Sequence, residues 1–302
     1  MSEKENCLIS AFLTYSTPVW SDKQHKSQQG LFFITAVYLI VICDTLWESG
    51  MSKPKWHAYS DLAWTESIVT SPDESAEETE LFVKVIKENS NIEVRTLLHL
   101  GCGAGANDYT FKMHFSVTGV DISDGMLEIA EKRNPEVTYV YGDMREIDLN
   151  ECFDAVAIPD SIGYMTTIED LRAAINTACK HLRPGGVLLI VAHTSEGFRE
   201  NNFAYTGSKE DIDVTIFENN YVSKSDRTIY EATFVYLIRQ KGKLVIYTDC
   251  HTLGVFTRAT WIALLTDAGL EIKQIKMDHS FDRFILGEGQ YPLLVFICIK
   301  PL

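Results

Sequence analysis

The chain has 302 residues, of which 46% are hydrophobic and 23% charged, a composition typical of a globular protein of one or two domains. Its formal net charge of −15, without a cluster of Lys and Arg, gives no electrostatic basis for nucleic-acid binding and disfavours anionic membrane surfaces. The seven cysteines are scattered and lack metal-ligand spacing. We therefore expect reduced thiols in a cytoplasmic protein, with neither a disulfide framework nor a metal site.

The apolar run Leu31–Cys43 is the main feature of residues 1–50. It is shorter than the roughly twenty residues that a membrane-spanning helix needs, and no small-residue signal-peptide cleavage site follows it. Three interpretations stay open: a packed or interfacial helix, a weak membrane anchor, and an extension upstream of the natural start. We favour the extension, because Met51 begins a stretch that looks like a fresh N-terminus.

A helix start is the first clear signal after Met51. Ser71 is a candidate N-cap, Pro72 takes the first helical position and Glu74 the third. This helix is predicted to end near Asn89.

Strands and helices then alternate, which predicts a parallel, doubly wound sheet. The expected strands are Thr96–Leu100, Ser116–Val120, Thr138–Tyr141, Phe153–Ile158 and Val187–Ala192. The expected helices are Asn107–Phe115, Asp124–Arg133 and a segment capped by Thr166 that runs to Leu182. The turn Arg183–Gly186 is expected to connect this last helix to its strand.

The pattern changes in the second half of the chain. Three long segments rich in Ile, Val, Tyr and Thr are separated by short polar turns, which is typical of an antiparallel meander. These segments are Ile212–Val222, Arg227–Arg239 and Leu244–Val255.

The last part of the chain returns to helix and strand. Thr257 is predicted to cap a final helix that ends at Gly269, and the strands Glu271–Met277 and Leu293–Lys300 follow it. We therefore expect an α/β fold, a doubly wound, mostly parallel seven-stranded sheet with an inserted antiparallel β lid. Segments 51–194 and 256–302 would form the main domain, and segment 195–255 the insertion.

The most informative stretch is a glycine-rich loop after the first predicted strand. From Gly101 onward it fits the G-x-G-x-x-A fingerprint of dinucleotide-binding folds, and Asp121 follows about twenty residues later, where a ribose-binding acid belongs. The loop fits equally well the E/D-x-G-x-G-x-G loop of S-adenosylmethionine (SAM) methyltransferases, with His99 in place of the usual acid. The loop alone leaves both ligands open.

Several stretches in a fixed order favour SAM over a nicotinamide cofactor. They are Leu98–Gly105, Gly119–Leu127, Gly142–Arg145, Asp160–Tyr164, Leu182–Gly186 and Ala268–Leu270. Over residues 51–302 the chain resembles the class I SAM-dependent methyltransferases. It is most similar to the small-molecule enzymes that include the amino-sugar N,N-dimethyltransferases.

The resemblance implies a cofactor site at the carboxyl ends of the parallel strands, where open α/β sheets bind ligands. Gly101, Gly103 and Gly105 would let the backbone approach the methionine part of SAM, with Cys102 as a small filler. Asp121 would accept hydrogen bonds from the ribose hydroxyls. The other implied contacts are Ile122 and Met126 against adenine, the Asp143 carboxylate and Met144 N–H on its polar edge, and the Ile158 carbonyl at the ammonium.

Four further side chains are candidates for the acceptor side of the site. Tyr59 resembles an N-terminal tyrosine that closes over the methionine part of SAM. Asp160 and Tyr164 are expected to shape the pocket around the methyl donor. His193, just past a strand end, would lie near the reactive end of the cofactor.

His251 is the main candidate for a substrate-binding or basic group. It stands in a stretch that resembles a histidine-containing strand of the sugar enzymes, before the last helix. By strand alternation it shares a face with Asp249 and Leu253, so it could point into the site. The aromatic residues Tyr221, Tyr230, Phe234 and Tyr236 are instead expected to belong to the core or to a dimer surface.

The expected reaction is methyl transfer to a small molecule by in-line displacement, with an amine nitrogen as the first choice of acceptor. A neutral amine needs no metal and no catalytic triad, whereas a hydroxyl needs a general base. Three alternatives stay open: O- or carboxyl-methylation, an NAD(P)-dependent oxidoreductase, and a SAM-binding protein without activity. The insertion would hold the acceptor and could pair two subunits in a homodimer.

Overall fold

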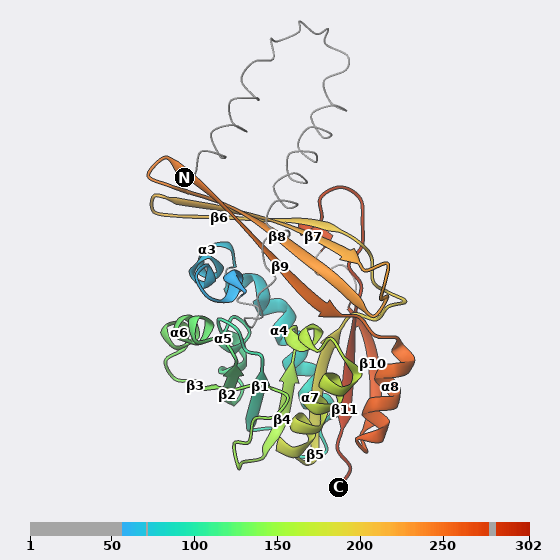
Figure 1. Ribbon diagram of the computed structural model, residues 1–302. Coiled ribbons are helices and arrows are strands. Elements are labelled where there is room, and N and C mark those ends of the chain that lie inside the picture. Colours follow the sequence, from blue (N-terminus) through green and yellow to red (C-terminus); the bar gives the residue numbers. More distant parts are fainter. Residues whose placement is uncertain (1–55, 71, 278–281) are drawn as a thin grey trace, which may run out of the picture. The chain divides into compact units, whose positions relative to one another are not determined.

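Residues 56–70, 72–277 and 282–302 are described by the computed structural model of this chain (Figure 1). The expectations for residues 1–50 and for an N-cap at Ser71 lie outside these residues. Within them, no helix combines the length and the hydropathy that crossing a membrane requires.

The larger sheet has seven strands. In chain order they are β1 (Thr96–Leu100), β2 (Ser116–Asp121), β3 (Thr138–Tyr141), β4 (Phe153–Ile158), β5 (Leu182–Ala192), β10 (Glu271–Met277) and β11 (Leu293–Ile299). They lie side by side in the order β10-β11-β5-β4-β1-β2-β3. Neighbours from β5 to β3 are parallel, whereas β11 is antiparallel to both β5 and β10. These pairings confirm the predicted mostly parallel sheet.

Helices cover both faces of this sheet. They are α4 (Pro72–Asn89), α5 (Asp108–Phe111), α6 (Asp124–Arg133), α7 (Ile168–His181) and α8 (Arg258–Asp267). On one face, Phe82 of α4 and Phe111 of α5 pack in a core cluster with the β1 residue Leu97. On the other face, Leu171 of α7 and Trp261 of α8 pack in a second cluster. Burial on both faces explains why the parallel strands are apolar without alternation.

Three predicted boundaries were wrong. The helix expected over Asn107–Phe115 is only the short α5, because the residues after it form tighter i→i−3 turn bonds. The N-cap of α7 is Thr167 rather than Thr166, since the Thr167 Oγ1 accepts a hydrogen bond from Asp170 N at 3.0 Å. Strand β5 begins at Leu182 instead of Val187, because Leu182 already pairs with Phe153 across a local irregularity. The caps predicted at Thr257 and Gly269 are confirmed.

The second sheet is antiparallel and has four strands in chain order. They are β6 (Asn202–Lys209), β7 (Ile212–Val222), β8 (Ile229–Gln240) and β9 (Lys243–Gly254). The last three correspond to the predicted meander, whereas β6 was not predicted. Its residues are mostly small or polar, so its pairing along the whole of β7 stabilises a strand that local propensity does not indicate.

A close approach explains one glycine in β6. A Cβ atom on Gly207 would lie 2.0 Å from the carbonyl oxygen of Ile68, which belongs to the short helix α3 (Glu66–Val69). Glycine therefore lets α3 pack directly on the second sheet.

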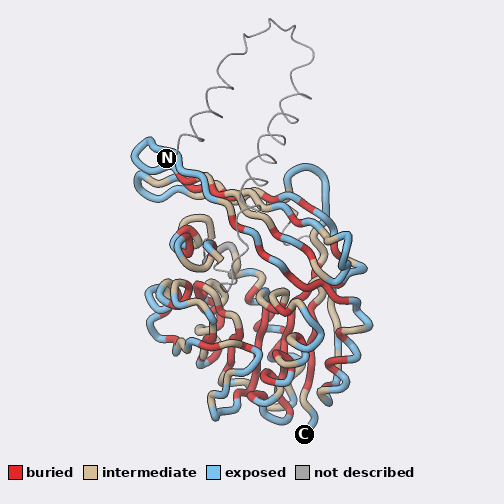
Figure 2. The backbone as a smooth tube through the Cα atoms, in the orientation of Figure 1, coloured by how far each residue is buried: buried red, intermediate tan, exposed pale blue. Residues whose placement is uncertain are grey.

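The second sheet lies over the carboxyl ends of the parallel strands (Figure 1). The chain leaves and re-enters the larger sheet at one place, where Thr194 and Phe256 form a bridge and Ser195 N donates to Phe256 O at 3.0 Å. Strand β9 contacts η3 (Ser161–Tyr164), which follows β4. Figure 2 shows the buried backbone running through the parallel strands up to this junction.

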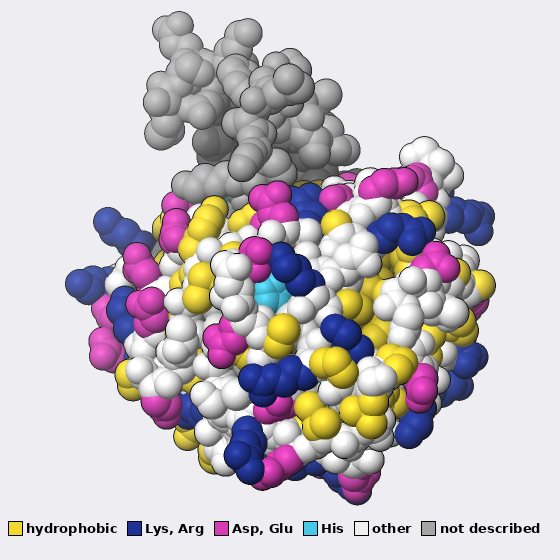
Figure 3. Space-filling view, turned by 90° about the horizontal axis from the view of Figure 1, so that it is seen from below, with side chains coloured by type: hydrophobic (Ala, Val, Ile, Leu, Met, Phe, Trp, Pro, Cys, Tyr) yellow, Lys and Arg dark blue, Asp and Glu magenta, His cyan; other side chains and the backbone are white. Residues whose placement is uncertain are grey.

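The opposite end of the sheet has an ordinary surface. Seen from below, Lys and Arg side chains alternate with Asp and Glu side chains, and no sign of charge dominates this face (Figure 3). The carboxyl ends of the strands are therefore the expected place for a site.

Candidate active site

Three glycines shape the loop after β1. Gly101, Gly103 and Gly105 have φ angles of +70°, +53° and +69°, in the left-handed region that favours glycine. The N–H groups of Gly101 and Cys102 both donate to the Val120 carbonyl, at 2.7 and 3.0 Å. A Cβ on Gly101 would lie 1.9 Å from Ser161 Oγ, whereas a Cβ on Gly103 would meet no atom within 4 Å. The backbone at Gly103 is therefore open to a ligand.

Asp121 ends β2 beside this loop. Its Oδ2 accepts a hydrogen bond from Gly103 N at 2.8 Å, and its Oδ1 accepts one from Ser123 N at 2.9 Å. Burial raises the pKa of the carboxyl group, and these backbone donors act in the opposite direction. A carboxylate has about four lone-pair sites, so Asp121 keeps acceptor capacity for a pair of ribose hydroxyls.

The histidine in the motif is paired with an acid from another position. His99 Nδ1 lies 2.7 Å from Asp108 Oδ1, and both side chains are buried. Tyr139 donates to the other oxygen of Asp108 at 3.0 Å, and Asn134 connects Tyr139 to the Gly105 carbonyl. Asp108 thus places a carboxylate beside the position where the motif usually has one.

The other predicted cofactor residues occupy different environments. Ile122 is 48% exposed beside Asp121 and is accessible to an apolar ring. Met126 is 5% exposed and packs against Ala63 and Ala104. The Asp143 carboxylate forms an ion pair with Arg145. These roles stay predictions.

The remaining three predicted cofactor residues are buried around the loop. Met144 lies 2.9 Å from the position that a Cβ on Gly101 would take, and Ile158 ends β4 with no exposed surface. Burial raises the pKa of the Cys102 thiol well above its usual range. An uncharged, buried thiol is consistent with the predicted filler role of Cys102.

The acceptor-side candidates Tyr59, Tyr164 and His251 lie together. Tyr59 belongs to η1 (His57–Tyr59), and its hydroxyl is 2.5 Å from the hydroxyl of Tyr164 in η3. Tyr164 Oη is 2.7 Å from His251 Nδ1, and His251 Nε2 is 3.0 Å from Asp249 Oδ2 on the same strand, β9. The N–H of Ala58 also donates to Asp249 Oδ2, at 2.8 Å. We call Tyr59, Tyr164, His251 and Asp249 the hydrogen-bond chain.

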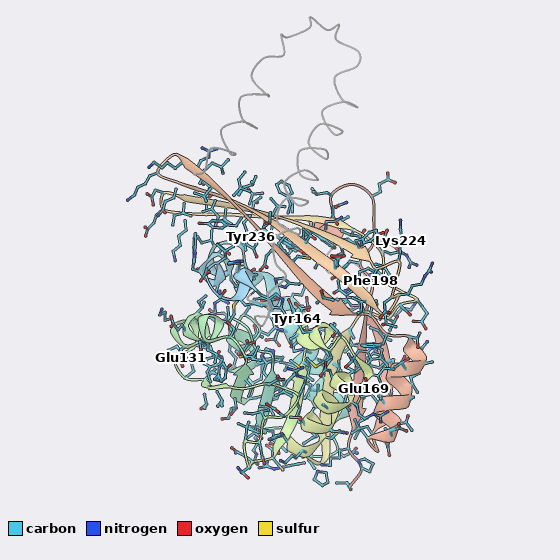
Figure 4. All side chains as sticks on the ribbon, in the orientation of Figure 1. Glu131, Tyr164, Glu169, Phe198, Lys224 and Tyr236 are labelled. Carbon is cyan, nitrogen blue, oxygen red and sulfur yellow. The ribbon has the colours of Figure 1, made fainter. Side chains whose placement is uncertain are left out.

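This chain of hydrogen bonds connects the cofactor side to the second sheet. Ser123 Oγ, next to Asp121, donates to the Tyr59 carbonyl. His251 is fully buried and Asp249 nearly so, whereas Tyr59 and Tyr164 are half-buried. Figure 4 labels Tyr164 at the carboxyl edge of the larger sheet and Tyr236 on the second sheet above it.

His193 lies in a separate aromatic group. Its ring contacts Tyr291 with ring centroids 4.3 Å apart, and also the rings of Phe198 and Tyr230. Burial lowers the pKa of His193 to about 4, so this imidazole is neutral at neutral pH. The structure does not join His193 to the hydrogen-bond chain.

An acidic group at this edge was only partly predicted. Burial raises the pKa of Glu66, Glu78 and Glu218, and the charge of Asp160 adds a smaller effect at each of them. The pKa of Asp160 is itself raised by desolvation from its surroundings, although its side chain is exposed. We call these four residues the acidic group. Burial and Asp160 together raise the pKa of Glu78 to about 7. Within the described residues, neither Asp160 nor Glu78 has a hydrogen-bond or ion-pair partner.

The glutamates gave no usable signal in the sequence. They come from α3, α4 and β7, and each resembles a solvated charge of an amphipathic helix or strand. Asp249 did carry a signal, since strand alternation places it on the face of His251. The charge of Asp160 also contributes to raising the pKa values of Tyr205, Tyr230 and Tyr291, after the larger effect of burial.

The loop, the acid at the end of β2 and the position at the carboxyl edge define a class of protein. This arrangement is typical of a nucleotide-cofactor site in a Rossmann-like α/β fold. The family described as "Methyltransferase domain" matches residues 97–186, which include most of β1, the glycine loop and β2.

Two relatives and a solved structure narrow this class. A dTDP-4-amino-2,3,4,6-tetradeoxy-D-glucose N,N-dimethyltransferase from Saccharopolyspora spinosa is 30% identical over 61% of this chain and 74% of its own length. A dTDP-3-amino-3,4,6-trideoxy-alpha-D-glucopyranose N,N-dimethyltransferase from Streptomyces venezuelae is 31% identical over 65% of this chain and 83% of its own length. The crystal structure of Streptomyces venezuelae DesVI is similar with a TM-score of 0.66 and 25% identity, over 80% of this chain and 96% of that one.

The chain therefore belongs to the SAM-dependent methyltransferases. The predicted family, fold, enzyme class and cofactor are confirmed, and the oxidoreductase alternative is not supported. The site fits SAM, because Asp121 offers carboxylate oxygens at the expected ribose position and the backbone at Gly103 is open. The individual roles of the site residues stay proposals.

Proposed function

We propose that this enzyme transfers the methyl group of SAM to the nitrogen of a small amine, with an amino sugar as the leading acceptor class. The observation that carries the proposal is the Asp160 carboxylate, which follows β4 and has no partner among the described residues. A carboxylate without a partner favours binding of a cationic amine over binding of a neutral alcohol or an anionic carboxylate. The printed activities of the two dimethyltransferase relatives support the same acceptor class.

The cofactor would be held at the glycine loop. Gly103 and Gly105 would approach its methionine part, Asp121 its ribose, and Ile122 its adenine ring. When bound, SAM supplies an electrophilic methyl group on a positively charged sulfur. Ser161 would keep the loop in place, because its Oγ donates to the Leu100 carbonyl at 3.1 Å.

The residues of the chain then act by positioning the acceptor and excluding water. The acidic group would attract the acceptor as an ammonium ion, and the tyrosines around Asp160 would offer hydroxyls to the hydroxyl groups of a sugar. The amine must lose a proton before it attacks, because only the neutral form has a lone pair. Glu78, with its pKa near 7, is suited to hold such a proton at neutral pH.

The second sheet would serve as a cover over the acceptor. This role is supported by the contact of β9 with η3 and by the packing of Tyr236 with Ala58 and Leu62. The proposal also includes a homodimer paired through this sheet and a cytoplasmic location. Size-exclusion chromatography with light scattering and cell fractionation would test these two points.

Calorimetric titration with SAM, S-adenosylhomocysteine and NADH is the first test. We expect both sulfur compounds to bind and NADH not to bind. Incubation with SAM and a panel of amino sugars, simple amines, alcohols and carboxylic acids, followed by mass spectrometry, would then identify the acceptor. A methyl gain on amines supports the proposal, whereas a gain only on alcohols or acids would replace it by O-methylation.

The variant Asp160→Asn tests the observation that carries the proposal. Loss of one attractive charge in a partly accessible site should raise the KM for the amine about 10-fold, with the Kd of SAM unchanged. The matched control is Glu169→Gln, an exposed change on α7 (Figure 4). An unchanged KM in Asp160→Asn would remove Asp160 from acceptor binding.

A further inference from the structure

The hydrogen-bond chain has a direction that one residue determines. Each hydroxyl and each imidazole N–H donates one hydrogen. The position of every hydrogen therefore follows from the group at the end of this series of hydrogen bonds. That end is Asp249, 8% exposed on β9. Asp249 Oδ2 receives two donors, Ala58 N–H at 2.8 Å and His251 Nε2 at 3.0 Å.

Asp249 is an acceptor only. Burial acts to raise the pKa of its carboxyl group, but the hydrogen bonds from His251 and from Ala58 N–H outweigh burial and hold this pKa below its usual value. An ionised carboxylate can only accept hydrogen bonds, so the hydrogen between the two side chains belongs to His251 Nε2.

The rest of the direction follows step by step. In a neutral imidazole with its hydrogen on Nε2, Nδ1 is an acceptor. The Tyr164 hydroxyl, 2.7 Å away, must therefore donate to Nδ1. Because its only hydrogen is used there, Tyr164 must accept from the Tyr59 hydroxyl. The Tyr59 oxygen is left with lone pairs and no hydrogen of its own to offer.

We propose that Asp249 is a positioning residue that acts through His251 to turn the oxygen lone pairs of Tyr59 and Tyr164 toward the acceptor. This inference rests on the proposed function, since it concerns an acceptor that carries N–H groups. An amine whose N–H donates to one of these oxygens has its own lone pair held in a defined direction. In-line displacement needs that lone pair aligned with the methyl carbon.

The location of the half-buried tyrosines agrees with this role. The charges of Asp160 and Asp121 both contribute to raising the pKa of Tyr59, after the larger effect of burial, so its hydroxyl lies near the proposed acceptor site and the proposed ribose site. The rings of Trp56, Tyr59, Tyr164 and Phe234 surround His251 and keep its imidazole in one orientation.

The reversed arrangement defines what the variant should do. In Asp249→Leu no carboxylate is present, and a hydrogen on Nε2 of His251 would be buried without an acceptor. The imidazole hydrogen is therefore expected on Nδ1, where the Tyr164 oxygen can accept it. Tyr164 then donates to Tyr59, and the Tyr59 hydroxyl hydrogen points outward.

The first measurement is ¹⁵N NMR of the histidine side chains in the full chain, with His251→Gln to assign the signal. We expect the hydrogen on Nε2 alone in the wild-type protein and on Nδ1 in Asp249→Leu. This measurement needs no substrate, so its result does not depend on the proposed function. A hydrogen on Nδ1 of the wild-type His251, in the other neutral tautomer or in an imidazolium, would overturn the inference.

The second measurement is steady-state kinetics with the amine found in the acceptor screen. Asp249→Leu should lower kcat about 100-fold, because the acceptor loses its alignment, and leave the Kd of SAM unchanged. Asp213→Leu, the same change at an exposed position on β7 of the same sheet, is the matched control. Wild-type kcat in Asp249→Leu would contradict the inference even if amine methylation is established.

A second variant tests the same inference if the first variant does not fold. Tyr164→Phe removes the middle hydroxyl without touching Asp249, and it should lower kcat to a similar extent. The double variant should lose no more than either single variant, since both interrupt one chain of hydrogen bonds. Additive losses would show that the two residues act separately and would refute the proposal.

Discussion

The cofactor side and the acceptor side of this site are built in different ways. The glycine loop, Asp121 and Met144 come from one continuous part of the chain, between β1 and the residues after β3. The hydrogen-bond chain and the acidic group come from η1, α3, α4, η3, β7, β9 and the loop after β4, which are far apart in the sequence. A short motif can therefore describe the first side, but only the folded chain brings the second side together.

This difference matters for what each side can change. The loop depends on positive backbone φ angles and on main-chain donors, so it tolerates few substitutions. The acceptor side depends on side chains carried by several separate elements, each replaceable without altering the larger sheet. Relatives can thus share a cofactor and differ in acceptor, and four substitutions test this division.

The largest effect is expected at Asp121. Asp121→Ala removes a carboxylate that would take two ribose hydrogen bonds and that also holds Gly103 N–H. At about 1.5 kcal/mol for each hydrogen bond to a charged group, the Kd of SAM should rise about 100-fold.

Calorimetric titration would measure this effect. Glu131→Ala, an exposed change on α6, is the control (Figure 4). Unchanged SAM affinity in Asp121→Ala would mean that the cofactor site lies elsewhere.

A smaller effect should separate two glycines of the same loop. Gly101→Ala adds both the cost of a positive φ, about 1 to 2 kcal/mol, and an overlap with Ser161 of about 1 to 3 kcal/mol. Gly103→Ala adds only the first cost, because its Cβ would meet no atom. Urea unfolding should therefore show Gly101→Ala to be less stable by about 2 kcal/mol.

SAM titration should complete the contrast between the two glycines. A methyl group on Gly103 points into the space proposed for the ligand, so SAM affinity should fall in Gly103→Ala despite its greater stability. Equal stability of the two variants would argue against the contact between Gly101 and Ser161.

An effect that is confined to high pH concerns Glu78 on the acceptor side. The pKa of Glu78 is raised from 4.5 to about 7, so the folded state holds this proton more tightly than the unfolded state. Its stabilising contribution is present below pH 4.5 and is lost as the pH rises through about 7. Glu78→Gln removes this loss and should be more stable than the wild-type protein by about 2 kcal/mol at pH 8, allowing for partial exposure of the side chain.

Urea unfolding at pH 4 and pH 8 would measure the effect. At pH 4 the two proteins should be equally stable. The neighbouring Glu77→Gln, an exposed change on α4, should alter stability at neither pH. A gain of equal size at both pH values would point to packing rather than to titration.

The sequence predicted the larger sheet well because its signals are local. Apolar strands, caps such as Thr257 and left-handed glycines such as Gly269 act within a few residues, and each is confirmed. The cap of α7 was misplaced by one residue because two threonines stand side by side and only Thr167 has extended backbone geometry. Strand β6 was missed because its pairing with β7, and not its own residues, makes it a strand.

On the acceptor side, Tyr59, Tyr164 and His251 were predicted separately and the structure brings them together. Glu66, Glu78 and Glu218 were not predicted, because a charge on an amphipathic element does not reveal which other charges lie near it. The distance between two elements depends on the fold and cannot be read from the spacing of residues in the sequence.

The short segment η1 has a consequence for the length of chain that activity requires. It contributes no strand and no large core helix, yet Tyr59 and the Ala58 N–H belong to it. A shortened chain that begins at Met51 keeps both groups. One that begins at Asp61 would keep every strand of the two sheets and the whole glycine loop, and would lose the donor to Asp249 together with the outermost hydroxyl. We expect such a truncated protein to bind its cofactor but to turn over slowly. The solubility and folding of a fragment therefore do not show where the chain needed for activity begins.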